Sequence, residues 1–143
     1  MKNDDRLIYQ LFMAQQKLRT YITNALITEG IKVTLGQAGI LFLLRRDDGQ
    51  TMTELSKILG VKNATLTGLI DRLERSAYVI RKASKNDRRS IRIYITPEGI
   101  KECDKAKPVI KTVNEEIKFG FSQEEIEVFK RVLNRVLQMF NQT

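Results

Sequence analysis

Eight basic side chains gather in one short stretch of this 143-residue sequence, between residues 72 and 92. Only Glu74 and Asp87 oppose them there, so this stretch carries +6 of the chain's net charge of +8. The basic residues are Arg72, Arg75, Arg81, Lys82, Lys85, Arg88, Arg89 and Arg92. A cluster of this density fits an extended anion, and the phosphate backbone of a nucleic acid is such an anion. The alternative is a solvated basic hairpin without a partner.

The sequence lacks the residues that most enzyme and metal sites need. It contains no His, which excludes a Ser-His-Asp triad, a Cys-His pair and a zinc site with His ligands. Cys103 is the only Cys, so an internal disulfide and a cage of several thiolates are also excluded. Glu102 and Asp104 flank this thiol, and nearby carboxylates raise a thiol pKa, so we expect an inert Cys. We expect no enzymatic activity, no metal and no cofactor.

Length and composition predict a single folded domain. Hydrophobic residues make up 42% of the chain and charged residues 29%, which is typical of a globular protein. The longest apolar run, from Ala38 to Leu44, has seven residues counting Gly39, whereas a membrane span needs about 20. A single thiol fits a reducing compartment, so we expect a cytoplasmic protein that does not enter a membrane.

Hydrophobic spacing and capping residues predict six helices around the basic stretch. They are expected at 6–28, 35–44, 52–59, 64–76, 97–120 and 123–140. Thr34, Thr51 and Ser122 each precede a Gln or Glu by three residues, which predicts capping boxes at three helix starts. Thr96 and Pro97 predict a fourth defined start. Pro108 is expected to kink or divide the helix that follows.

Between the fourth and fifth helices the hydrophobic period changes to two. Residues 78–83 and 90–95 are predicted strands, and 84–89 form a polar hairpin tip. The order helix, short helix, helix and two-stranded ribbon predicts a winged helix-turn-helix. The turn near Gly60 would hold helix 64–76 away from the body, where it fits a major groove about 12 Å wide.

Four stretches of the sequence resemble the MarR family of bacterial transcription regulators. They are Thr53–Gly60 (TELSKILG), Thr65–Glu74 with its LIDRLE, Asp87–Arg89 (DRR) and Tyr94–Gly99 (YITPEG). The pieces are weakly specific alone, but their order and spacing are strongly specific. The similarity covers the whole chain, including the helices on both sides of the winged helix.

The resemblance implies a single domain, 1–143, that is mainly α with a small β-wing. Residues 1–33 would form an N-terminal dimerisation helix, 34–97 the winged helix-turn-helix, and 98–143 the C-terminal dimerisation helices. An obligate homodimer follows, and the apolar stripes agree with it because a winged helix alone is too small to cover them. The stripe residues are Leu7, Leu11, Ile126, Phe129, Leu133, Val136 and Phe140. The alternative is that these helices pack on each other within one chain.

The resemblance also implies which side chains meet double-stranded DNA. They are Lys62, Asn63, Thr65, Thr67, Gly68, Arg72, Arg81, Lys82, Lys85, Arg88 and Arg89. Asn63 and the threonines would meet base edges, and Arg72 a phosphate. Arg89 matches the wing arginine that enters the minor groove. Asp87 would orient an arginine through a salt bridge, or form the hairpin turn.

Three positions depart from the family pattern. Lys62 replaces a small polar helix cap, so Asn63 is expected to cap instead. Gly68 replaces a larger side chain, which reduces the number of base contacts. Ala77 stands where a Gly commonly ends the helix, and it would carry about 1 kcal/mol of strain if its φ is positive.

Many relatives release DNA when a small lipophilic or phenolic effector binds between the dimerisation helices and the winged helix. The candidate lining residues are Tyr9, Phe12, Met13, Tyr21 and Phe42. An aromatic stripe at helical spacing is also what a core requires. The expected function is therefore a homodimeric DNA-binding regulator, most simply a repressor, that reads a pseudo-palindromic operator. The alternative is a winged helix that docks an acidic protein and binds no specific DNA.

Overall fold

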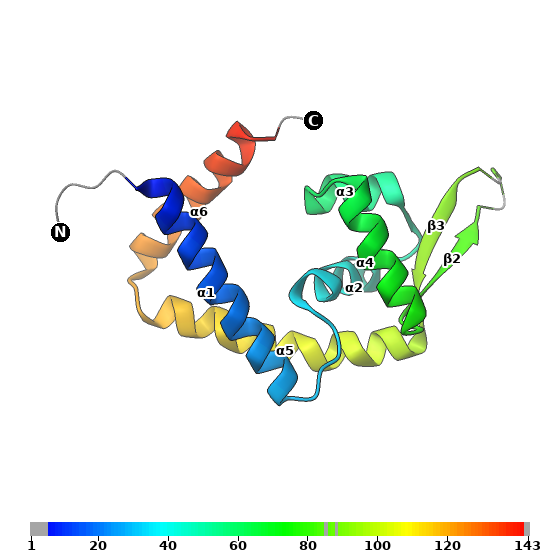
Figure 1. Ribbon diagram of the computed structural model, residues 1–143, viewed down its shortest axis with the longest axis horizontal. Helices are drawn as coiled ribbons and strands as arrows, with labels where there is room; N and C mark the ends of the chain where they lie inside the picture. The colour runs from blue at the N-terminus through cyan, green and yellow to red at the C-terminus, as the bar shows by residue number, and fades with distance from the viewer. Residues whose placement is uncertain (1–5, 85, 88, 142–143) are drawn as a thin grey trace.

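A computed structural model describes residues 6–84, 86–87 and 89–141 of the chain (Figure 1). The described residues form six helices and a small sheet, and apart from the short strand β1 the elements follow one another in the order expected. They are α1 (Leu7–Thr28), α2 (Leu35–Arg46), β1 (Gln50–Thr51), α3 (Met52–Leu59), α4 (Asn63–Arg75), β2 (Val79–Ala83), β3 (Ile91–Ile95), α5 (Pro97–Phe119) and α6 (Gln123–Met139). The prediction of a mainly α fold with a small β-wing is confirmed.

All three predicted capping boxes are present. At Thr34 the hydroxyl oxygen accepts from the Gln37 amide, and the Gln37 side chain accepts from the Thr34 amide in return. Thr51 with Glu54, and Ser122 with Glu125, make the same reciprocal pairs. Each pair satisfies two amide groups that a helix start leaves without partners, which explains why these short local signals determine the boundaries.

The core lies in the winged helix and where α5 crosses it. Its fully buried side chains come from α1, α2, α3, α4, the two wing strands and α5. Leu41, Leu55, Leu66, Ile70 and Ile93 are among those with no exposed surface. Packing against this core, more than helix propensity, holds α2, α3 and α4 in place.

The predicted two-stranded ribbon is present as β2 and β3, and a third strand, β1, which the sequence did not predict, joins the same sheet. β3 is the central strand, paired antiparallel with β2 on one side and with β1 on the other. β1 contains only Gln50 and Thr51, which pair with Ile93 and Arg92. Such a short strand has no periodicity of its own, because its pairing comes from residues more than 40 positions away.

Helix α5 runs through Pro108 without interruption, so of the two outcomes expected there, a kink or a division, the division was wrong. Proline removes one backbone hydrogen bond from a helix. Buried side chains on both sides of it, Ala106 and Val113, keep the two halves of α5 on the same core. The Thr112 hydroxyl also donates to the carbonyl oxygen of Pro108 at 2.9 Å.

In Figure 1 the winged helix and the outer helices form two distinct regions. Helices α2, α3 and α4 and the wing lie to one side, and α1, α6 and the second half of α5 lie to the other. Helix α5 extends along the base of both regions. No helix in the described part of the chain is long and apolar enough to cross a lipid bilayer.

Candidate nucleic-acid interface

The turn between α3 and α4 fixes the direction in which α4 leaves the body. Gly60 ends α3 in the left-handed conformation, with φ of 66°. The Ser56 hydroxyl donates to the carbonyl oxygen of Val61 at 2.7 Å and closes the turn. Leu66, Ile70 and Leu73 then bury one side of α4 in the core. The opposite side of the helix is left facing solvent.

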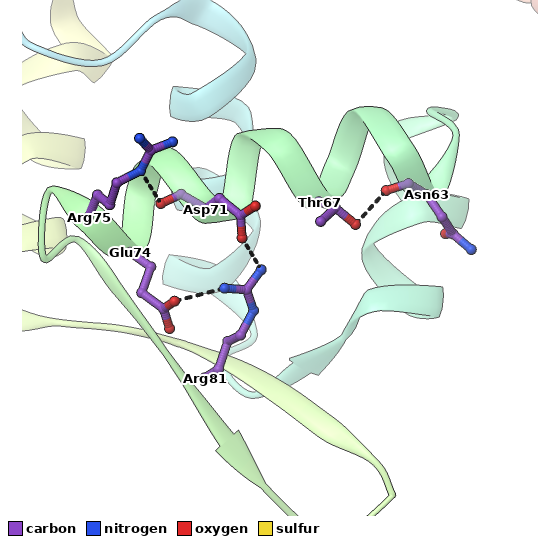
Figure 2. A network of polar contacts seen from close by, with 6 residues as sticks. All are labelled: Asn63, Thr67, Asp71, Glu74, Arg75 and Arg81. Carbon is purple, nitrogen blue, oxygen red and sulfur yellow. Dashed lines mark hydrogen bonds and ion pairs between the residues drawn. The ribbon is translucent and has the colours of Figure 1, made fainter.

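This exposed side carries the polar residues expected at DNA. Asn63, Thr65, Thr67 and Arg72 are exposed, and Gly68 is half-buried. Thr67 donates its hydroxyl hydrogen to the carbonyl oxygen of Asn63 at 2.8 Å, so an acceptor oxygen and a methyl group remain for a partner (Figure 2). Asn, Thr and Arg on an exposed helix face are suited to reading base edges and phosphates.

The expectation that Asn63 caps α4 was wrong. Lys62 occupies the cap position with extended backbone angles, and it makes no side-chain capping bond. Asn63 is the first helical residue, and its side chain points away from the helix in Figure 2. The exposed Lys62 side chain also stands at the amino end of α4, where the helix dipole favours an anion.

The wing tip is shaped by Asp87. Its carboxylate accepts from the backbone amide of Arg89 at 3.0 Å, and its carbonyl oxygen accepts from the amide of Ser90. Asp87 therefore forms the turn, which is one of its two expected roles, and it has no ion pair among the described residues. Arg89 is exposed and faces an open hollow of about 450 Å³ that Met52 and Thr53 of α3 also line. Lys85 and Arg88, both expected at DNA, lie outside the described residues.

Arg81 lies in a cluster of opposite charges. Its Nη2 atom is 2.6 Å from Asp71 Oδ1, and its Nη1 atom is 2.7 Å from Glu74 Oε1 (Figure 2). The hydrogen bond to Asp71, together with that to Glu74, raises the pKa of Arg81, although partial burial opposes this. Both carboxylates belong to α4, so Arg81 links strand β2 to that helix.

Sequence reasoning did not identify Asp71 and Glu74 as partners of Arg81. A signal was available, because two carboxylates three positions apart share one helix face. The first arginine of the next strand is a natural partner for such a pair. What the sequence does not supply is the angle between α4 and β2, which decides whether they meet.

The other basic residues of the wing have different surroundings. Lys82 is exposed, and its Nζ atom lies 5.6 Å from the centre of the Tyr94 ring. Arg92 donates to the carbonyl oxygen of Gly49 at 2.8 Å, and Asp48 accepts from the amide of Ile95 at 2.9 Å. These contacts hold the base of the wing on the turn that precedes β1.

The apolar stripes of the outer helices stay largely uncovered. Leu7 is 62% exposed, Phe129 54% and Phe140 75%, while Leu11 and Leu133 are exposed to a smaller degree. Ile126 and Val136 are half-buried, and α6 buries none of its side chains fully. Packing of α1 and α6 within one chain, the alternative weighed for these stripes, therefore does not cover them.

The structure places four of the five candidate effector residues on α1 and the fifth, Phe42, on α2. Tyr9, Phe12 and Met13 are exposed on α1, and Phe42 is half-buried against the core. Tyr21 lines a groove of about 620 Å³ between α1 and α5. Its hydroxyl donates to Glu116 at 2.6 Å, and this hydrogen bond raises the pKa of Tyr21.

Cys103 is buried in α5. Burial is the main cause that raises the pKa of its thiol, and the carboxylate of Asp104 adds to it. Sequence reasoning gave the right direction but named the flanking carboxylates as the cause. A thiol that is shielded and protonated in this way is unreactive.

Known proteins resemble this chain in both sequence and fold. Residues 33–91 match the family model described as MarR family. The HTH-type transcriptional repressor YetL of Bacillus subtilis is 29% identical over 134 residues, which is 92% of this chain and 79% of YetL.

Two solved protein–DNA complexes share the fold. A mutant MarR from E. coli in complex with operator DNA gives a TM-score of 0.83 at 25% identity, over 93% of this chain and 94% of that one. The S. aureus MepR–DNA complex gives a TM-score of 0.85 at 24% identity, over 94% of this chain and 98% of that one.

Proposed function

Since the chain belongs to the MarR family of transcription regulators, we propose that it is a homodimer that binds a pseudo-palindromic DNA operator and represses transcription. The observation that carries the proposal is the position of α4. Its polar side is exposed beside a basic wing, in the half of the molecule remote from the uncovered apolar helices. A DNA-binding face and a dimerisation face are therefore separate.

The uncovered helices support a dimer. Helix α6 has 17 residues and buries none of them, and an isolated helix of that length is marginal in water. Helix α6 and the first half of α1 leave many large apolar side chains exposed, and soluble monomers rarely expose extended apolar patches. A second copy of the chain presents the same surface, so two copies related by a two-fold axis can cover each other's apolar side chains.

On DNA, each subunit would read one half-site. We propose that Asn63, Thr65 and Thr67 meet base edges while Lys62 and Arg72 contact phosphates. The exposed Arg89 would enter the minor groove beside that half-site, where negative potential is greatest if the groove is narrow. Two subunits then require half-sites about 10 base pairs apart, one turn of the duplex.

The relatives favour the same function. MarR and MepR have been solved with DNA, and YetL is named a transcriptional repressor. A repressor that binds the bacterial chromosome acts in the cytoplasm, where we place this protein.

An effector, if one acts here, would enter the groove between α1 and α5. The floor is apolar, with Ala25, Val109 and Val113, while Glu29 and Glu116 stand at the rim. Two carboxylates repel an anionic phenolate, so we propose a neutral or cationic lipophilic molecule. Release of bound DNA by a lipophilic cation, and not by a matched phenolate, is the expected result; release by the phenolate alone would contradict it.

The mass of the protein in solution tests the dimer. The chain has a mass of 16.5 kDa, and we expect sedimentation to give twice that value. Leu133→Asp places a charge in the apolar stripe and should give a monomer that no longer retains DNA at physiological salt. Asn134→Asp adds the same charge to the neighbouring, polar position and should remain dimeric. A wild-type monomer, or a dimeric Leu133→Asp variant, would contradict the proposal.

A further inference from the structure

We propose that Arg81 is a positioning residue that ties the wing to helix α4, and that it does not contact DNA phosphate. The inference rests on the proposed function, because its consequence appears when DNA binds. From charge alone, Arg81 would be counted among the basic residues that contact DNA phosphates.

The geometry is that of a brace between two elements. Asp71 and Glu74 lie three residues apart on α4, so their carboxylates lie on one face of that helix. Arg81 extends from β2 into the space between them, and each terminal nitrogen of its guanidinium meets a different carboxylate (Figure 2). A planar group with two terminal nitrogens can hold two carboxylates at once, whereas a single ammonium group lacks this fixed fork.

The surroundings of Arg81 are unfavourable for a phosphate. Its side chain is only 26% exposed, and both of its terminal nitrogens already have partners. The two carboxylates are 47% and 41% exposed, so solvent and an approaching polyanion would meet them first. The three groups together carry a net charge of −1, and this repels phosphate.

The position of the brace gives it control over the wing. Arg81 pairs across the sheet with Ile93, the fully buried residue at the middle of the central strand. The base of the wing is also fixed to the turn before β1, because Arg92 donates to the carbonyl oxygen of Gly49 and the amide of Ile95 donates to Asp48. The Arg81 contacts are the described ion pairs that join the wing to α4. With the backbone bonds of Ala77 and Tyr78 to the end of α4, they help to set the angle between the two elements.

That angle matters because α4 and the wing must meet one duplex at the same time. If the wing swings freely, Arg89 must be ordered during binding, and ordering costs affinity. The brace orders the wing beforehand. The carboxylates also keep Arg81 from contributing a sequence-independent attraction, so they favour specific over non-specific binding.

Two variants of Arg81 separate positioning from phosphate contact. Binding is measured over a range of salt concentrations, with the duplex that the wild-type protein enriches from a random pool and with a scrambled duplex of equal length. Arg81→Gln and Arg81→Lys should both bind the enriched duplex roughly ten-fold more weakly, because neither can bridge the two carboxylates. The salt slope should remain that of the wild type.

Lys82→Gln is the matched control for the loss of one charge. Lys82 is the next residue of β2 and points to the opposite face of the sheet, where no carboxylate contacts it in the described structure. If it contacts a phosphate as expected, its replacement lowers the salt slope by about 1. The double variant Asp71→Asn/Glu74→Gln releases Arg81, and it should strengthen binding to the scrambled duplex and steepen its salt slope.

Two results would overturn the proposal: wild-type affinity in either Arg81 variant, or a salt slope lowered by about 1 in Arg81→Gln. A double-mutant cycle on urea unfolding, with Arg81→Gln and Asp71→Asn, tests the brace without DNA. Additive effects in that cycle would also contradict it. If the wild-type protein enriches no duplex, the proposed function fails, and a non-additive cycle would still support the brace.

Discussion

The Thr96 hydroxyl donates to the carbonyl oxygen of Ala77 at 2.6 Å, and in this way one side chain joins the end of α4 to the start of α5. The Thr96 hydroxyl oxygen in turn accepts from the backbone amide of Gly99 at 3.0 Å and caps α5. The backbone amide of Thr96 donates to Tyr78 at 3.0 Å. Residues almost 20 positions apart thus hold the base of the wing between two helices.

Replacement of Thr96 should therefore destabilise the fold. We expect Thr96→Ala to lower the free energy of unfolding by about 1–3 kcal/mol, because it removes a helix cap and leaves the Ala77 carbonyl without this donor. Thr96→Ser keeps the hydroxyl and should lose less than half as much. Urea unfolding followed by circular dichroism measures both, and equal losses in the two variants would show that the hydroxyl is not responsible.

Ala77 has a positive φ of 64°, the only such non-glycine residue in the described part of the chain. Side chains with a Cβ atom are strained in this left-handed conformation. Ala77→Gly should raise the free energy of unfolding by about 0.5–1 kcal/mol, since the relief of strain exceeds the greater entropy of glycine in the unfolded chain. A melting temperature of Ala77→Gly below that of the wild type would show that Ala77 is not strained.

Gly68 lies inside α4, and a Cβ atom added there would meet no neighbouring atom within 4 Å. Alanine is favoured over glycine by about 1 kcal/mol inside a helix. Gly68→Ala should therefore stabilise the protein by about that amount without any rearrangement. Denaturant unfolding checks this, provided that the wild type and the variant have the same m-value. A lower free energy of unfolding in the variant would show that the added methyl group does contact neighbouring atoms.

The raised pKa of Cys103 predicts both its reactivity and a pH effect. At neutral pH a maleimide should label the folded protein far more slowly than the urea-unfolded chain, because the thiol is buried and protonated. Since folding raises this pKa, the folded state holds the proton more tightly. Its contribution to stability is complete below the unfolded thiol pKa and is lost as the pH rises through the folded value.

Cys103→Ala serves as the control for that pH effect. Its stability should fall less steeply above the ordinary thiol pKa than that of the wild type. Identical pH profiles of wild type and variant would contradict the assignment to Cys103.

Local signals account for the parts of this fold that the sequence predicts well. Each capping box joins residues three apart, such as Thr51 and Glu54, and the Gly60 turn needs only its own backbone angles. The heptad-like spacing of Ile126 to Phe140 likewise appears within one helix. These features depend on neighbours along the chain, so their residue types are sufficient to identify them.

The features that sequence reasoning missed depend on residues distant in the chain. Strand β1 exists because Gln50 meets Ile93, and Arg81 is paired because β2 passes beside α4. Pro108 was expected to kink or divide α5, and tertiary packing keeps the helix continuous. In each case the deciding energy comes from contacts whose geometry is set by the whole fold.

Selection of bound duplexes from a random DNA pool, at about 150 mM salt, tests the central claim most directly, because low salt hides specificity behind phosphate attraction. The account predicts an enriched pseudo-palindrome with half-sites about 10 base pairs apart. Binding without enrichment would contradict the claim of a specific operator and would indicate an architectural role on DNA. No binding of the dimer to any duplex would contradict it as well, and would favour a winged helix that docks another protein.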